Sequence, residues 1–143
     1  MYILDTNVVS ELRKVRTGKA DPHVAAWAEG TDAAGLFLSA ITIAELELGI
    51  LLRERKDPVQ GAILRLWLDR HVLPAFSSRT LPIDAAVAQR YARLCVPDKR
   101  NEHDALIAAT ALVHGMTVVT RNVADFQPTG VTILNPWQPA RAG

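Results

Sequence analysis

The chain has 143 residues, of which 49% are hydrophobic and 22% are charged, and its formal net charge is +1. These values describe one ordinary globular domain, and a nucleic-acid binder with so little net charge must concentrate its basic residues locally. No apolar run is long enough to span a bilayer, so we expect no membrane partner. The single Cys95 cannot form an internal disulfide, which favours a reducing compartment, the cytoplasm.

Short apolar runs alternate with helical patterns along the whole chain. In chain order the pattern predicts a strand over 2–4, a helix over 7–12, a basic connector over 13–19, a helix over 21–29, a strand over 35–39 and helices over 41–55 and 58–76. It then predicts a weak edge strand over 80–83, a helix over 84–94, a buried helix over 105–113, a strand over 116–120, a polar loop over 122–130 and a strand over 131–134.

This alternation predicts an α/β fold in which helices cover both faces of a parallel sheet. We expect three layers, with the helices on either side of about four or five central strands. The domain should extend over residues 1–137, with a frayed tail at 138–143.

Acidic and amide side chains follow several of these strands or open the helices after them. They are Asp5, Glu45, Asp104, Asn122 and Asp125. Because parallel strands end at the same edge of a sheet, we expect these side chains to converge on one crevice. Clustered carboxylates need cations, since like charges raise one another's pKa. Oxygen ligands without a His or Cys cluster favour Mg²⁺ or Mn²⁺ over Zn²⁺.

Each of these residues also has a purely structural interpretation. In chain order, the structural roles are an N-cap for Asp5, a capping box for Thr42-x-x-Glu45, a cap with a first-turn acid for Asn101-x-x-Asp104, and a turn residue for Asp125. Glu47 lies on an apolar helical face as Glu45 does, so periodicity does not separate the two. The histidines, including His103, are scattered without metal-site spacing and are interpreted as surface or helix-end residues.

Four stretches, in order and with family-like spacing, resemble the motifs of PIN-domain ribonucleases. They are 2–7 (Tyr-Ile-Leu-Asp-Thr-Asn), 39–46 (Ser-Ala-Ile-Thr-Ile-Ala-Glu-Leu), 101–111 (Asn-Glu-His-Asp-Ala-Leu-Ile-Ala-Ala-Thr-Ala) and 120–126 (Thr-Arg-Asn-Val-Ala-Asp-Phe). One motif alone would be weak, but four in series are a strong signal. The ending from Gly130 to Trp137 resembles the FitB-like branch of the bacterial VapC toxins.

The resemblance implies a metal-dependent endoribonuclease that is the toxin of a type II toxin–antitoxin pair. Such an enzyme would hydrolyse RNA phosphodiester bonds with Mg²⁺, or with Mn²⁺, and inhibit translation or growth. By motif position, the resemblance assigns Asp5, Glu45 and Asp104 as catalytic, metal-binding acids, and so selects Glu45 over Glu47.

The fourth motif departs from the acid-rich form of the family. Asn122 stands where many relatives have Asp, and Asp125 lies three residues later. Both are further candidate ligands, and a second ion is left open. Hydrogen-bonding support for the acids is expected from Thr6, Asn7, Ser39 and Thr120. Candidate phosphate contacts are Arg13, Lys14, Arg16, Lys19, Arg100 and Arg121.

The resemblance also implies macromolecular partners. These are RNA, a cognate antitoxin of the VapB or FitA type whose helix lies in a groove, and a second copy of the chain in a homodimer that assembles into a larger complex. The helices at 41–55 and 58–76 carry more apolar residues than a core of this size needs, which predicts an interface.

Two other functions compete with this one. A PIN-fold binding module with a weak site would keep the partner contacts and lose RNA cleavage. A phosphatase of the haloacid-dehalogenase type also has an Asp after its first strand, but it normally carries a second acid two residues later, where this chain has Asn7.

Overall fold

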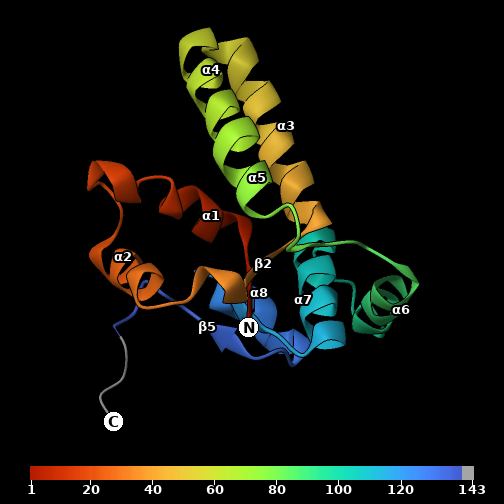
Figure 1. Cartoon of the computed structure of the whole chain (residues 1–143). Coiled ribbons are helices and arrows are strands. Elements are labelled where there is room, and N and C mark those ends of the chain that lie inside the picture. The colour runs from red at the N-terminus through yellow and green to blue at the C-terminus, as the bar shows by residue number, and fades with distance from the viewer. Residues whose placement is uncertain (140–143) are drawn as a thin grey trace.

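The computed structural model describes residues 1–139, and these form a five-stranded sheet flanked by helices (Figure 1). The strands are β1 (Tyr2–Leu4), β2 (Leu36–Ser39), β3 (Thr80–Leu81), β4 (Thr117–Val119) and β5 (Ile133–Leu134). The helices are α1 (Thr6–Leu12), α2 (Pro22–Glu29), α3 (Ala40–Lys56), α4 (Pro58–Trp67), α5 (Leu73–Ala75), α6 (Ala85–Leu94), α7 (Glu102–His114) and α8 (Val123–Phe126).

The strand order is β3-β2-β1-β4-β5, and every neighbouring pair is parallel. Strand β1 therefore lies in the centre, where Tyr2 is in register with Leu36 of β2 and Leu4 with Val119 of β4. The C-terminal ends of all five strands meet at one edge, which is where ligands bind in open α/β sheets. The predicted α/β class with a parallel sheet is confirmed.

Two hydrophobic cores lie on opposite faces of this sheet. Leu4 packs with Val8 of α1 in one core, whereas its neighbour Ile3 packs with Ile107 and Ala108 of α7 in the other. Successive strand residues point to opposite faces, so a strand buried on both sides must be apolar throughout. Figure 1 shows the resulting layers, with α1 and α2 on one side of the sheet and α6 and α7 on the other.

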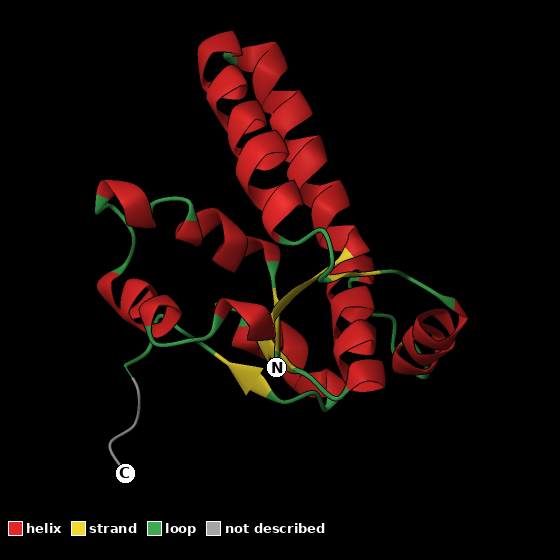
Figure 2. Ribbon diagram, viewed as in Figure 1, coloured by secondary structure: helices red, strands yellow, loops and turns green. Residues whose placement is uncertain are grey.

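Helices α3 and α4 form a hairpin that extends away from the sheet (Figure 2), and we refer to residues 40–67 as the arm. The hairpin turns at Asp57, whose side chain caps α4 by accepting a hydrogen bond from the Gln60 amide at 3.2 Å. Pro58 follows in the first turn, where its missing N–H costs nothing. The predicted helix break at Asp57-Pro58 is therefore confirmed.

Two predicted elements differ from the structure. Residues 58–76 are not one α-helix, because a π-helical turn at Leu68–Val72 separates α4 from α5, just before Pro74 removes a backbone donor. The polar loop predicted over 122–130 is helical, with α8 followed by a 3₁₀ turn at Gln127–Thr129. The fully buried Phe126 anchors this segment in the second core, and an element of four residues is too short to show periodicity.

The chain end is described only in part. The Gln138 amide donates to the Asn135 carbonyl at 3.2 Å, so the first residue of the predicted frayed tail is hydrogen-bonded. The rest of that prediction, at residues 140–143, lies outside the described residues. No helix within residues 1–139 is both long and apolar enough to cross a membrane.

Gly61 sets how closely the two helices of the arm approach each other. A Cβ at this position would lie 2.6 Å from Cα of Glu54, which is a backbone atom and cannot move alone. We expect Gly61→Ala to lower the free energy of unfolding by about 1–3 kcal/mol, measured by urea denaturation. In the same arm, Gly49 has open space around it, and Gly49→Ala should raise stability by about 0.5–1 kcal/mol. Equal effects of the two substitutions would contradict the close approach.

Candidate active site

Asp5 occupies the central position at the C-terminal edge of the sheet. Its backbone N–H donates to the Val119 carbonyl at 2.9 Å, which extends the β1–β4 pairing by one residue. The side chain is only 5% exposed, and the Thr6 amide donates to Oδ1 at 2.8 Å. Oδ2 accepts from Thr120 Oγ1 at 2.8 Å and from Asn7 Nδ2 at 3.3 Å. Asp5 thus caps α1 through Oδ1, as the capping interpretation expects. Its other oxygen, Oδ2, is held at the sheet edge by Thr120 and Asn7.

Glu45 reaches the same edge from α3. Thr6 Oγ1 donates to its Oε1 at 2.9 Å, and His103 Nδ1 lies 3.4 Å from its Oε2. The capping-box interpretation of Glu45 is wrong, because α3 begins at Ala40 and its cap is Ser39, whose Oγ accepts from the Ile41 amide at 3.2 Å. Ser39, predicted as a supporting residue, therefore orients the helix that carries Glu45.

Glu47 points to a different neighbour. Its carboxylate pairs with the guanidinium of Arg65 on α4, which also contacts Glu54 at 3.3 Å. The choice between Glu45 and Glu47, which helical periodicity leaves open, is thus made by tertiary contacts. Glu47 binds the two helices of the arm together, and Glu45 faces Thr6.

Asp104 lies in the first turn of α7, where Asn101 caps the helix by accepting from the Asp104 amide at 3.1 Å. The pKa of Asp104 is raised to about 6, chiefly by burial and then by the charges of Asp5, Asp125 and Glu45, while His103 lowers it. A first-turn acid favours the helix dipole, so repulsion and desolvation outweigh that benefit here.

The pKa of Asp5 is raised as well. Burial is the largest cause, and the charges of Glu45 and Asp125 add to it, whereas hydrogen bonds from Thr120 and Thr6 partly offset the shift. Asp5, Glu45, Asp104 and Asp125 therefore form one electrostatic group, which we call the acid cluster. A cluster whose members raise one another's pKa is a candidate cation site.

The fourth predicted motif contributes unequally to this cluster. Asp125 lies in the first turn of α8 and is exposed, and its charge raises the pKa of the buried Asp5 and of the partly buried Asp104. Asn122 contacts the site through its backbone, because its N–H donates to Thr120 Oγ1 at 3.0 Å. The Thr120 hydroxyl thus links the Asn122 backbone to the Asp5 side chain. It orients the Asp5 carboxylate and not the side-chain amide of Asn122.

The acid cluster is open rather than closed around a central point. Within residues 1–139, no three His, Cys, Asp or Glu side chains lie at the spacing that encloses an ion directly. Mg²⁺ keeps several of its waters and is usually held by one or two carboxylates, so an open cluster of oxygen donors suits it. The donor atoms are carboxylate oxygens, the type that hard divalent cations take, and these residues do not form a tetrahedral Zn²⁺ site.

The basic residues predicted to contact phosphate are not gathered at the acid cluster, and Arg121 is the one exception. The Arg121 amide donates to Asn7 Oδ1 at 3.4 Å, and its guanidinium lies 5.2 Å from the ring centroid of Trp137. Lys14 pairs with Glu11 at 3.2 Å, and Arg100 Nε donates to the Leu94 carbonyl at 2.6 Å. The other candidates are Arg13 and Arg16, which line a hollow between α1 and α4, and the exposed Lys19.

His103 is the residue at this site that the sequence does not identify. The sequence pattern indicates a surface or helix-end residue, yet its ring faces Glu45. The only local signal is its position next to Asp104 in the first turn of α7. That position does not reveal a contact with a residue on α3.

Comparison with known proteins gives consistent matches over nearly the whole chain. The family model for the PIN domain matches residues 2–127. The VapC ribonuclease Y4jK of Sinorhizobium fredii is 39% identical, covering 98% of this chain and 100% of that protein. The toxin FitB of Neisseria gonorrhoeae is 38% identical, covering 96% and 99%. The FitAcB crystal structure from Neisseria gonorrhoeae superposes with a TM-score of 0.85 at 36% identity, covering 96% of this chain and 99% of that one.

Proposed function

The chain belongs to the PIN-domain family, and on that premise we propose that it is a Mg²⁺-dependent endoribonuclease, the toxin of a type II toxin–antitoxin pair. Its action would hydrolyse RNA phosphodiester bonds in the cytoplasm and so inhibit translation or growth. The observation that carries the proposal is the acid cluster, in which the charge of Asp5 helps to raise the pKa of Asp104. A binding module without chemistry gives no reason to bury Asp5 among other acids.

Asp5 and Asp104 would hold the ion, directly or through water, and Glu45 would complete or orient its ligands. Mn²⁺ could replace Mg²⁺ at oxygen donors of this kind. When bound there, the cation would lower the pKa of a water and offset charge on the scissile phosphate. The protein's own contribution is orientation, since Thr120 and Asn7 fix Asp5, and Thr6 fixes Glu45.

Glu45 and Glu47 provide a matched pair of variants that tests this proposal. We expect Glu45→Gln to slow Mg²⁺-dependent cleavage of single-stranded RNA by about 10- to 100-fold, because the carboxylate that would orient the ion is lost. Glu47→Gln should leave the rate unchanged, since that side chain contacts Arg65. EDTA should stop cleavage by the parent. If the parent cuts RNA equally well in EDTA, or if the two variants behave alike, the proposed role of the cluster is wrong.

We also propose that the arm binds protein partners, namely an antitoxin and a second copy of the chain. The structures that this chain resembles include FitAB bound to a DNA fragment, at 34% identity and a TM-score of 0.86. The arm exposes large apolar side chains, an arrangement that marks interfaces: Leu48, Leu51, Leu52, Val59, Ile63 and Leu66. Ile63 and Leu66 also line the hollow of about 380 Å³ against α1, beside Arg13 and Arg16. An amphipathic helix with acidic residues would suit this hollow.

The interface proposal predicts that Ile63→Glu disrupts assembly without unfolding the chain. Ile63 is 51% exposed, so a charge there costs little in the monomer but is unfavourable in an apolar interface. The measurement is size-exclusion chromatography of the chain alone and after co-expression with the product of the neighbouring gene. Val96→Glu is the control, because Val96 is an exposed apolar residue in the loop after α6, outside the arm. Unchanged assembly of Ile63→Glu would exclude this part of the arm as the interface.

A further inference from the structure

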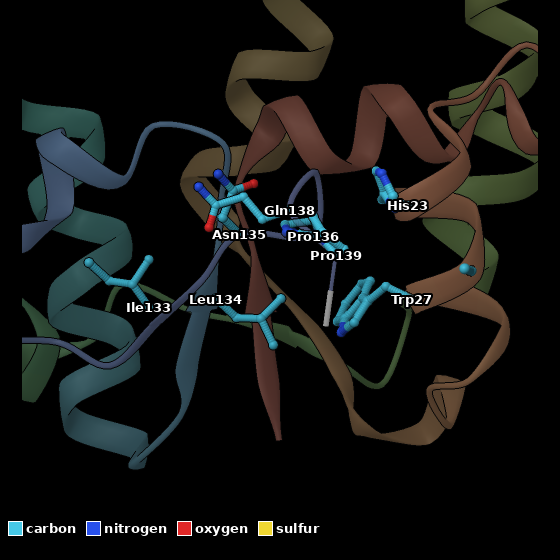
Figure 3. Close-up of a pocket in the computed structure, with 9 residues that line it drawn as sticks. His23, Trp27, Ile133, Leu134, Asn135, Pro136, Gln138 and Pro139 are labelled. Atoms are coloured by element: carbon cyan, nitrogen blue, oxygen red, sulfur yellow. The ribbon is translucent and has the colours of Figure 1, made fainter. Parts of the chain in front are cut away.

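A hollow of about 600 Å³ lies between α2 and the edge strand β5. His23, Ala26 and Trp27 of α2 form one wall, and Leu134, Asn135 and Gln138 belong to the opposite side (Figure 3). Pro136 and Pro139 also line the hollow, and Figure 3 shows them between Asn135 and Trp27. We call this hollow the β5 pocket, and its volume is in the range of small-ligand sites.

The β5 pocket reaches the same edge of the sheet as the acid cluster, with β4 between them. The Leu134 carbonyl, in the pocket wall, accepts from the Thr120 amide at 3.0 Å. The Thr120 hydroxyl in turn donates to Asp5 Oδ2 at 2.8 Å. Asn135 follows β5 at the same edge at which Asp5 follows β1. A ligand that spans the end of β4 could therefore contact both places.

The walls combine an aromatic ring with amides. Trp27 is held by an edge-on contact with Tyr2, with ring centroids 5.6 Å apart and planes at 84°. The Asn135 amide is oriented because its Oδ1 accepts from the Trp137 N–H at 3.0 Å. Amide groups can pair with the edges of bases, and an indole can stack on any of them.

The lining of the β5 pocket carries no charge that would repel a segment of a polyanion. Among the described residues that line the β5 pocket, none is acidic. The exposed Arg121 has neighbours on either side: its backbone contacts Asn7, which donates to Asp5, and its guanidinium lies over Trp137, next in the chain to Pro136 and Gln138 of the pocket lining. A phosphate between the acid cluster and the pocket would meet this guanidinium, which suits phosphate recognition.

We propose that the β5 pocket binds one unpaired nucleoside of the RNA, next to the phosphate that is cleaved. Its base lies against Trp27, the amides of Asn135 and Gln138 read the base edge, and Arg121 contacts the intervening phosphate. This inference rests on the proposed ribonuclease function and adds to it a position at which the enzyme selects sequence. A base in a duplex could not enter, so the pocket also selects single-stranded RNA.

The test fills the pocket without removing a contact. Ala26 is exposed on α2 and lines the pocket, so Ala26→Phe adds a ring where the base would lie. We expect KM for single-stranded RNA to rise about tenfold with kcat nearly unchanged, since stacking of one base is worth this much. Gln138→Ala should weaken the preference among oligonucleotides that differ at one position beside the cut. The matched control is Ala86→Phe, at an exposed alanine of α6 on the other side of the sheet. It should change neither KM nor the preference among oligonucleotides.

A second readout does not depend on cleavage. The indole N–H resonance of Trp27, assigned with Trp27→Phe, should shift when nucleoside 5′-monophosphates are added to the parent, and should not shift in Ala26→Phe. If the parent cuts RNA but KM, base preference and this resonance are all unaffected, the pocket inference is overturned while the ribonuclease proposal stands. If the parent cuts no RNA, the ribonuclease proposal fails, and the Trp27 resonance alone decides whether the pocket binds a nucleoside. Dissociation of an oligomer by Ala26→Phe would instead identify the pocket as a protein interface and overturn the inference.

Discussion

Asp5→Asn is expected to lower the rate of Mg²⁺-dependent RNA cleavage by about a thousandfold, because the central charged ligand is lost, and that corresponds to about 4 kcal/mol of activation free energy. The substitution keeps the size of the side chain and one carbonyl oxygen. That oxygen can still accept from Thr120, whose hydroxyl contacts Asp5 at 2.8 Å. The new NH2 group then replaces Oδ1 and can no longer accept from the Thr6 amide, so the cap of α1 weakens while the Thr120 contact persists and the negative charge disappears.

The same substitution should not unfold the protein. The pKa of Asp5 is raised by burial and by neighbouring acids, so the folded, metal-free chain is destabilised by this charge at neutral pH. We expect the melting temperature of Asp5→Asn in EDTA to stay close to that of the parent, because relief of the buried charge offsets the lost hydrogen bond from the Thr6 amide. Asp32→Asn, at an exposed cap of a short 3₁₀ turn, is the control for both measurements and should not slow cleavage. Cleavage by Asp5→Asn at the parent's rate would show that the acid cluster is not the catalytic site.

The strands and the acids at their ends could be predicted from the sequence because both signals are local. A run such as Tyr2–Leu4 is apolar on both faces, and Asp5 interrupts it abruptly. The edge at which Asp5 and Thr120 meet then follows from parallel strand order alone. At β1 and the residues that follow it, the tertiary structure agrees with the local preference, which is the condition under which such predictions succeed.

The features that the sequence does not reveal depend on contacts between distant segments. Glu45 and Glu47 have equivalent positions on α3 until Thr6 and Arg65 are placed beside them. His103 carries no signal before α7 is packed beside α3. In α8, the buried Phe126 anchors the segment, and a helix of only four residues, Val123–Phe126, is too short to show periodicity.

Asp104→Asn should make the metal-free protein more stable at neutral pH and no more stable in acid. The pKa of Asp104 is about 6 in the folded chain and 3.8 as the reference for an unfolded one. The folded state therefore binds the proton more tightly, and its stability falls as the pH rises from about 4 to about 6 and stays low above that. Asn carries no charge at any pH, so the variant escapes this loss. The full shift corresponds to about 3 kcal/mol, which we reduce to about 1–2 kcal/mol because solvent partly screens the side chain.

Added Mg²⁺ should reverse the order of the two proteins. The parent's cost at neutral pH comes chiefly from burial of the Asp104 charge and then from repulsion by the other acids. A cation that binds the folded state alone offsets this cost and so stabilises the parent. Asp104→Asn has lost that carboxylate and should gain less. The measurement is the melting temperature of both proteins in EDTA at about pH 4 and about pH 7.5. The variant should melt roughly 3–8 °C above the parent at the higher pH, and at the same temperature as the parent at the lower pH. Asp98→Asn, in the exposed loop before α7, is the control and should have the parent's melting temperature at both pH values. A difference that persists at low pH would mean that Asp104 acts through its shape or its helix contacts, and the electrostatic basis of the cluster would then be lost.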